Sequence, residues 1–221
     1  MKSNSNKNKT HRRYVALVAM LLAGLAASWT TGGNSDGTTS GTAGSIAPST
    51  TVYTGLDAAT IAELRGDFTG AVESMAATEK AIRSMDARFP DERLLWPPMA
   101  RAYRASLEGL IGKHSLKLLE KFNRVNVAIT DYDGLIEAYP ESLELRFMRF
   151  AFYSQLPGLF GVGSFVDPDR ALLPDMLAQG KDKRVPDSHK LEMINWMLKD
   201  GKPDKTETTR LKAAATKLGG R

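Results

Sequence analysis

The sequence contains no cysteine. This absence excludes disulfide bonds, thiolate nucleophiles and the cysteine ligands of zinc and iron–sulfur sites. The chain also lacks any sustained alternation of apolar and polar residues, which is the period of a half-buried strand. We therefore expect an all-α protein that is held together by its hydrophobic core alone, and we expect no cofactor.

Acidic residues are missing from residues 1–28, which contain five basic residues. The whole chain has 30 basic and 25 acidic residues and a formal net charge of +5. Without those five bases, 25 residues of each sign remain, so residues 29–221 carry no net charge. A surface that follows a phosphate backbone has to be basic. The charge balance therefore argues against a nucleic-acid partner.

An apolar run, YVALVAMLLAGLAA at 14–27, follows the basic start of the chain. This layout is typical of a secretory signal peptide, and the run is shorter than the roughly 20 residues of a membrane-spanning helix. We expect residues 1–28 to be a signal peptide that directs the protein to the periplasm, the cell envelope or the medium. The alternative is an uncleaved anchor, which would be the one contact with a membrane. Residues 29–51, rich in Gly, Ser and Thr, are expected to form a flexible linker before a helical domain at 52–221.

Two neighbouring helices are expected at the centre of the fold, over residues 118–138 and 143–153. Apolar residues recur every three or four positions along the first helix. Tyr139-Pro140 ends it, because the residue before a proline disfavours the α conformation. Ser142 is the expected N-cap of the second helix. That helix is apolar nearly all round, which is typical of a helix surrounded by other helices.

The other helices are expected to cover this pair, which gives about seven helices in all. One helix is expected to begin near Leu56 and to stop at Gly66, with the next one starting at Asp67. After the central pair, a short helix is expected to begin at Asp167 and to end at Gly180. Two further helices complete the C-terminal part.

Two helical hairpins end alike, in ARFP at 87–90 and EAYP at 137–140, 50 residues apart. With this internal repeat the chain resembles the tetratricopeptide repeat family, whose own repeat has about 34 residues. The resemblance implies a short solenoid of stacked antiparallel helix hairpins with an irregular C-terminal helical cap. It also implies a groove for a protein partner and no chemistry. The matching positions are small, aromatic and aliphatic residues at Gly66, Phe68, Ala71, Val72, Ala100, Tyr103, Ala128, Ile129, Tyr132, Leu135, Ile136, Pro140 and Tyr153.

Residues 156–166 hold three glycines among apolar side chains. A phosphate-binding glycine loop follows a strand and precedes Lys-Ser or Lys-Thr, and neither condition is met here. Two interpretations stay open. The segment is either a buried connector or an exposed apolar lip of Leu159, Phe160 and Phe165 that grips a peptide, an acyl chain or a membrane.

Arg146 and Arg149 are the two charges that follow Glu144 on the otherwise apolar helix, one turn apart. A charge in this place needs solvent, a carboxylate partner or a bound anion. It forms either an internal ion pair with a neighbouring helix or part of a groove that recognises a carboxylate, such as a peptide terminus. Trp96 and Tyr103 either line the same groove or stack between helices.

His114 and His189 are expected at helix ends, where a histidine is ordinarily solvated or caps the helix, and they lack the spacing of a metal site. Asp131 and Asp133 point about 200° apart on one helix, so they form no acid–base pair and are expected to be solvated. The sequence therefore predicts no metal ligands and no catalytic residues.

The signal-peptide layout and the resemblance to the tetratricopeptide repeat family together imply an exported, non-enzymatic protein-interaction module or scaffold of the bacterial cell envelope. Its expected partner is a protein or peptide, with Arg146, Arg149, Trp96 and Tyr103 as candidate contacts. The alternative function is binding of a small apolar or acyl ligand beneath the loop at 156–166.

Overall fold

The computed structural model describes residues 49–219, and these residues form helices and connecting turns without a strand. The predicted all-α class is confirmed. The signal peptide expected at 1–28 and nearly all of the linker expected at 29–51 lie outside the described residues. The α-helices are α2 (Ala58–Ala71), α3 (Met75–Arg88), α4 (Pro98–His114), α5 (Leu118–Ala138), α6 (Leu143–Tyr153), α7 (Gly163–Gln179), α8 (Asp187–Asp200) and α9 (Lys205–Gly219). Three short 3-10 turns join them: η1 (Ser49–Tyr53), η2 (Arg93–Leu95) and η3 (Gly158–Phe160).

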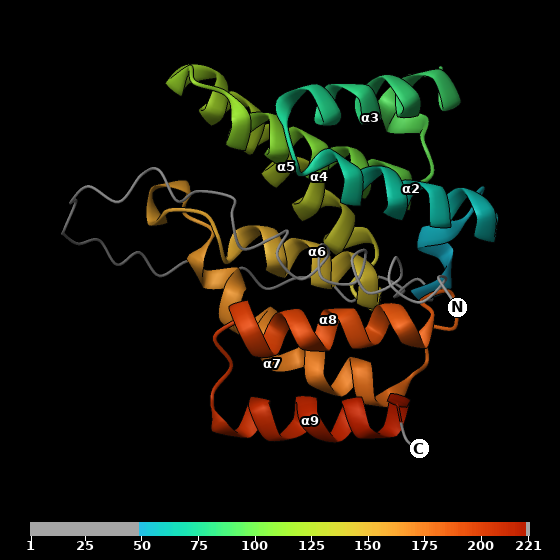
Figure 1. Ribbon diagram of the computed structural model, residues 1–221, viewed down its shortest axis with the longest axis vertical. Coiled ribbons are helices and arrows are strands. Elements are labelled where there is room, and N and C mark those ends of the chain that lie inside the picture. The colour runs from blue at the N-terminus through green and yellow to red at the C-terminus, as the bar shows by residue number, and fades with distance from the viewer. Residues whose placement is uncertain (1–48, 220–221) are drawn as a thin grey trace, which may run out of the picture.

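The helices stack along the long axis of the molecule in three groups (Figure 1). Helices α2 to α5 form one end, α7 to α9 form the other, and α6 lies between them. Consecutive helices pair within the first group, and α9 packs on both α7 and α8 in the second. None of the helices at 49–219 is long and apolar enough to cross a lipid bilayer. The solenoid arrangement of the stack stays a prediction.

Helix α6 has the central position that its sequence predicts. All of its side chains except that of Arg146 are buried. The Ser142 hydroxyl accepts a hydrogen bond from the Leu145 amide at 3.4 Å, so Ser142 is the N-cap. A helix that is buried on every side needs neighbouring helices on every side. Helix α6 packs on α4 and α5 at one end of the molecule and on α7 at the other.

Two glycines of α4 let the neighbouring helices approach closely. A Cβ atom added to Gly109 would lie 2.7 Å from Cε2 of Phe152 on α6, which is too close for two carbon atoms. A Cβ on Gly112 would lie 3.1 Å from Cγ2 of Val125 on α5. Helix α4 is therefore the surface on which α5 and α6 are both seated.

Two predicted helix boundaries are wrong. Gly66 does not end a helix, because α2 continues to Ala71 and the next helix starts at Met75, with the Ser74 hydroxyl as N-cap. A glycine inside a helix costs only about 1 kcal/mol, which burial of Ile61, Leu64 and Ala71 on one continuous face outweighs.

The second error is the start of α7, which begins at Gly163 and not at Asp167. It contains Pro168 and Pro174, so the helix accommodates two residues that ordinarily interrupt one. Its end is as predicted, since Gly180 adopts the left-handed conformation (φ 61°) that closes a helix.

Candidate functional site

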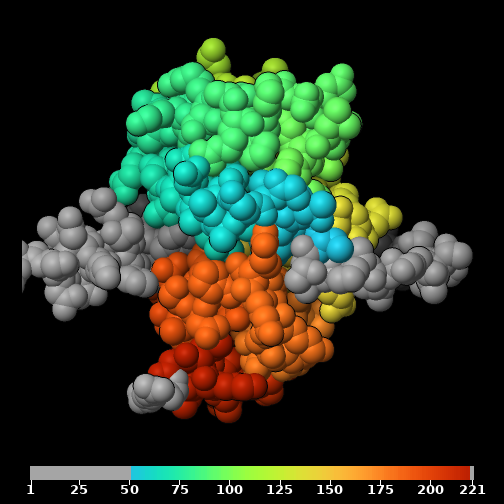
Figure 2. All heavy atoms as spheres, turned by 90° about the vertical axis from the view of Figure 1, so that its right-hand side faces the viewer, coloured from blue at the N-terminus to red at the C-terminus, as the bar shows by residue number. Residues whose placement is uncertain are grey.

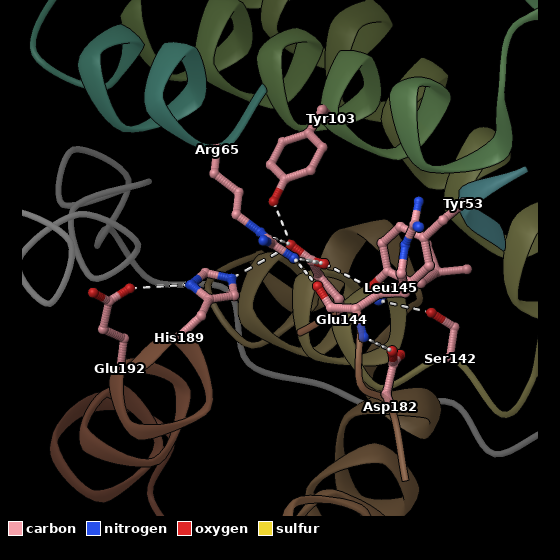
Figure 3. Close-up of polar contacts among 10 residues, drawn as sticks. Tyr53, Arg65, Tyr103, Ser142, Glu144, Leu145, Asp182, His189 and Glu192 are labelled. Carbon is pink, nitrogen blue, oxygen red and sulfur yellow. Dashed lines mark hydrogen bonds and ion pairs between the residues drawn. The ribbon is translucent and has the colours of Figure 1, made fainter. Parts of the chain in front are cut away.

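A buried carboxylate, Glu144, lies where the two ends of the molecule meet (Figure 3). Its side chain has no exposed surface. Four other elements each contribute a side chain to it, and we call the group the Glu144 cluster. The members are Tyr53 of η1, Arg65 of α2, Tyr103 of α4, Glu144 of α6, and His189 with Glu192 of α8.

Local structure places Glu144 at this junction. The Ser142 cap starts α6, so Glu144 lies in the first helical turn, where a negative charge is favoured by the helix dipole. The same turn faces α2 and α4 on one side and α8 on the other (Figure 3). The space-filling view shows the cyan start of the described residues in contact with the orange C-terminal segment (Figure 2). The guanidinium of Arg184 donates to the carbonyl oxygen of Leu56 at 2.5 Å.

Both oxygens of Glu144 accept hydrogen bonds. Arg65 binds them bidentately, with Nε donating to Oε1 at 2.8 Å and Nη2 donating to Oε2 at 2.6 Å. The hydroxyl of Tyr53 donates to Oε2 at 2.7 Å, and that of Tyr103 donates to Oε1 at 2.5 Å. Nε2 of His189 lies 3.4 Å from Oε1, and its Nδ1 lies 3.0 Å from Oε2 of Glu192. A buried carboxylate with this many donors is held firmly in its ionised form.

Burial and hydrogen bonding act in opposite directions on the titration of this cluster. Burial alone would raise the pKa of Glu144, but the hydrogen bonds and charges of Arg65 and His189 outweigh it and lower the pKa well below its ordinary value of 4.5. Burial alone would lower the pKa of His189, but Glu144 and Glu192 raise it above 6.5. The pKa of Tyr53 is raised by its burial and by the negative charge of Glu144. At neutral pH the carboxylate is thus ionised and the phenol is neutral.

The geometry of the Glu144 cluster suits cohesion between helices. A general base needs a free lone pair directed at a substrate proton, whereas the oxygens of Glu144 already accept from Arg65, Tyr53 and Tyr103. Across residues 49–219, no group of three or more His, Asp or Glu side chains is arranged to hold a metal ion. The cluster therefore joins five elements through one charge.

Arg146 and Arg149, predicted partner contacts, both bind Asp169 of α7. Nη1 of Arg146 donates to Asp169 Oδ1 at 2.6 Å. Nε and Nη2 of Arg149 donate to the two oxygens of Asp169, each at 2.8 Å. The guanidinium of Arg149 also lies 5.2 Å from the ring centre of Phe165. These contacts agree with the first of the two interpretations of the arginines, an internal ion pair with a neighbouring helix.

The other two predicted contacts lie in different surroundings. Trp96 is buried, donates its indole N–H to the carbonyl oxygen of Asp91 at 2.9 Å, and stacks on Phe89 with ring centres 5.3 Å apart. Tyr103 belongs to the Glu144 cluster. The structure therefore divides the four predicted residues among three sets of contacts. Their role in partner binding stays a prediction.

The loop at 156–166 is partly buried and partly exposed, so neither of the two interpretations describes it fully. Val162 is buried, whereas Leu159 and Phe165 are exposed. The ring of Phe160 stacks on that of Phe122 of α5 with centres 5.1 Å apart. The loop is thus fixed to α5 at Phe160, with an exposed apolar side chain beside that contact.

Two polar side chains that the sequence placed in solvent are buried or paired. His189 is buried in the Glu144 cluster, because α8 packs its first turn toward α6. Asp131 forms ion pairs with Arg93 and, at 3.7 Å, with Arg101. Glu144 itself was missed as a site residue. The signal that could have identified it is a single acid in the first turn of a helix that is otherwise apolar on every side.

Comparisons of the chain with protein-family models, with curated proteins and with solved structures find no match. The functional argument therefore depends on the residues and their geometry.

Proposed function

We propose that this protein is a non-enzymatic protein-interaction module, exported to the bacterial cell envelope, and that it binds a protein or peptide partner through an apolar patch. The patch consists of Leu118 and Phe122 of α5 with Leu159 and Phe160 of η3. We call it the lip patch.

One observation carries the proposal: the stacking of Phe122 on Phe160 joins exposed leucines from two distant parts of the chain. Leu118 lies one turn before Phe122 and is 59% exposed, and Leu159 precedes Phe160 and is 61% exposed. Leu116, at the turn before α5, is fully exposed. Contiguous exposed apolar side chains mark sites of contact with other molecules more often than isolated ones do.

The pairing of buried acids with arginines also supports the proposal of an interaction module. Five acidic side chains are buried in the described part of the chain, and arginine side chains bind four of them. Arg65 binds Glu144, Arg146 and Arg149 bind Asp169, Arg170 binds Glu207 at 3.0 Å, and Glu108 is bound by Arg104 at 2.6 Å and by Arg124 at 2.9 Å. The fifth, Asp182, accepts a hydrogen bond from the backbone N–H of Arg184 at 3.1 Å. Buried acids that are neutralised in this way fix helices against one another. A rigid helical frame with exposed apolar side chains suits binding of a partner.

A capture experiment with matched variants tests this function. Full-length protein with Leu118→Glu and Leu159→Glu is compared with the wild type in capture from envelope extracts, with quantitative mass spectrometry of the bound proteins. Leu172→Glu is the control, because Leu172 is 48% exposed but lies on α7. We expect one protein to be enriched by the wild type and the control, and lost with the double variant. Equal capture by all three, or retention of a lipid in place of a protein, would contradict the proposal.

Export is tested separately by fractionation. Cells are converted to spheroplasts and treated with protease, and the chain is followed by its mass. We expect the protein to be released or degraded, with a chain shortened by about the 28 residues of the proposed signal peptide. Protection together with the cytoplasmic markers would contradict export.

A further inference from the structure

A second charged cluster lies between η2, α4 and α5, and arginines outnumber acids in it. We call it the arginine cluster. Its members are Arg93 of η2, Arg101, Arg104 and Glu108 of α4, and Arg124 and Asp131 of α5. Four positive charges therefore meet two negative ones. The half-exposed Asp86 of α3 adds one acid at the edge, 3.5 Å from Nε of Arg104, so an excess of positive charge still remains.

Glu108 is occupied by the arginines on either side of it. Its Oε1 accepts a hydrogen bond from Nη1 of Arg104 at 2.6 Å, and its Oε2 accepts one from Nη1 of Arg124 at 2.9 Å. Arg93 lies between the two acids, with Nη1 3.5 Å from Oε1 of Glu108 and Nη2 paired with Asp131. The carboxylates of the cluster are therefore bound before Arg101 is counted.

Arg101 is the member whose donors are not used. Its Nη2 lies 3.7 Å from Oδ1 of Asp131, which is too long for a hydrogen bond. Its Nε is buried and, within residues 49–219, has no hydrogen-bond acceptor. A guanidinium carries five N–H donors, and a buried donor that is left unpaired costs free energy. Arg101 therefore lacks an acceptor of the kind that an anion supplies.

The arginines of the cluster also repel one another. Burial lowers the pKa of Arg93 below its ordinary value of 12.5, and the positive charges of Arg104 and Arg101 lower it further, against the opposite effect of Glu108. Like charges that are held together with little access to water cost free energy unless a counter-charge accompanies them. A bound anion would relieve this repulsion.

The cluster can be reached from solvent. The side chain of Arg93 is 28% exposed and that of Arg101 is 21% exposed. An open hollow of about 430 Å³ lies beside α5, and Arg93 and Asp131 are part of its lining. The charge of Asp131 is already compensated by Arg93. The hollow therefore gives a small ligand room beside Arg93, with Arg101 on the far side of the Asp131 carboxylate.

From the excess of arginine, the unpaired donors of Arg101 and the adjacent hollow, we propose that the arginine cluster binds an oxyanion, a carboxylate or a phosphate group. Arg101 and Arg93 are the residues that bind it. A guanidinium matches the geometry of either group and binds it with two parallel hydrogen bonds. The site shares no residue with the lip patch, so the proposal stands whether or not the lip patch binds a protein.

Thermal unfolding of the full-length chain with added anions tests the site. Sodium phosphate and sodium acetate are each compared with sodium chloride at equal ionic strength. We expect about 20 mM of at least one of the two anions to raise the melting temperature by at least about 3 °C over chloride, because a ligand that binds only the folded state stabilises it. The larger of the two shifts identifies the preferred group.

Two arginine variants separate binding at the cluster from a general effect of the salts. Arg101→Gln should lose the shift. Arg210→Gln is the matched control and should keep it, because it removes the same charge from α9 at the other end of the molecule, where Arg210 binds Asp175 at 2.8 Å. A shift that is absent from the wild type, or equal in the wild type and Arg101→Gln, would overturn the proposal.

Stability without the anion separates binding from a structural role of Arg101. Since its contact with Asp131 is long and its Nε is unpaired, we expect Arg101→Gln in chloride to melt no more than about 2 °C below the wild type. A larger decrease would mean that Arg101 serves the fold, and it would overturn the proposal as well.

Discussion

At the scale of single residues, Glu144 connects more of the molecule than any other side chain described above. It accepts hydrogen bonds from Tyr53, Arg65 and Tyr103 and lies 3.4 Å from a nitrogen of His189. Removing one partner of a buried ion pair leaves an uncompensated charge, which costs far more than the pair itself contributes. The cluster is therefore sensitive to substitution at its centre.

Substitution of the central carboxylate tests this sensitivity. Glu144→Gln leaves the guanidinium of Arg65 without a counter-charge, and we expect the free energy of unfolding to fall by about 3–5 kcal/mol. Urea denaturation measures the change. Glu141→Gln is the control, because Glu141 is exposed just before the same helix, and we expect it to change stability by less than about 0.5 kcal/mol. Similar small changes for both variants would show that the Glu144 cluster does not stabilise the fold.

The pH dependence of stability should follow His189. Its pKa in the folded protein is raised above 6.5, so its contribution is fully present below pH 6.5 and is lost as the pH rises through the folded value. The lowered pKa of Glu144 contributes stability above pH 4.5 that is lost as the pH falls through its folded value. Stability from this pair is therefore greatest between about pH 4.5 and 6.5.

A histidine variant isolates the upper limit of that window. We expect the stability difference between the wild type and His189→Gln, from urea unfolding, to be largest near pH 6 and to shrink as the pH rises above 6.5. A difference that is constant across this range would mean that His189 does not titrate with folding.

The contacts of single residues also differ in how well they could be predicted from the sequence. The Ser142 cap and the end of the helix at Tyr139-Pro140 depend on neighbouring residues, and both are confirmed. The partners of Glu144 depend on the fold, since Tyr53 is 91 positions and Arg65 is 79 positions away in the chain. A lone acid on an apolar helix indicates a buried pair, but periodicity and spacing cannot identify which distant side chains complete it.

At the scale of elements, the glycines of the helices have different roles that their sequence context does not reveal. Gly109 of α4 lies where Phe152 leaves no room for a Cβ atom, whereas Gly66 of α2 has open space around it. The prediction that Gly66 ends a helix was wrong because residues on both sides of it, Leu64 and Ala71, are buried on one face of α2. A helix-interrupting residue is tolerated where tertiary packing on either side of it holds the helix together.

Two alanine substitutions with opposite expected effects test this distinction. Gly109→Ala should destabilise the protein by about 1–3 kcal/mol, because the new methyl group must displace the ring of Phe152. Gly66→Ala should stabilise it by up to about 1 kcal/mol, because alanine favours the helix and meets no neighbour. Thermal unfolding measures both changes. The interpretation would be wrong if both variants moved the melting temperature in the same direction.

At the scale of the whole molecule, the N-terminal and C-terminal helices form two groups that α6 joins (Figure 1). The composition and periodicity predicted the all-α class and the buried α6. They did not predict that α8 reaches α6 through a charged cluster, since this depends on how the C-terminal helices turn back on the chain. Arginines bind the buried acids Glu144, Asp169 and Glu108 within the frame, and we propose that the exposed apolar side chains of the lip patch make the contacts with other molecules.

The most direct test of this account is hydrogen exchange of the full-length chain with and without Glu144→Gln. The central claim is that one carboxylate of α6 holds both ends of the stack. We therefore predict that amide exchange becomes at least about 100-fold faster in α2 and in α8 together, which corresponds to about 3 kcal/mol. Faster exchange confined to α6, or to only one of the two ends, would contradict the claim.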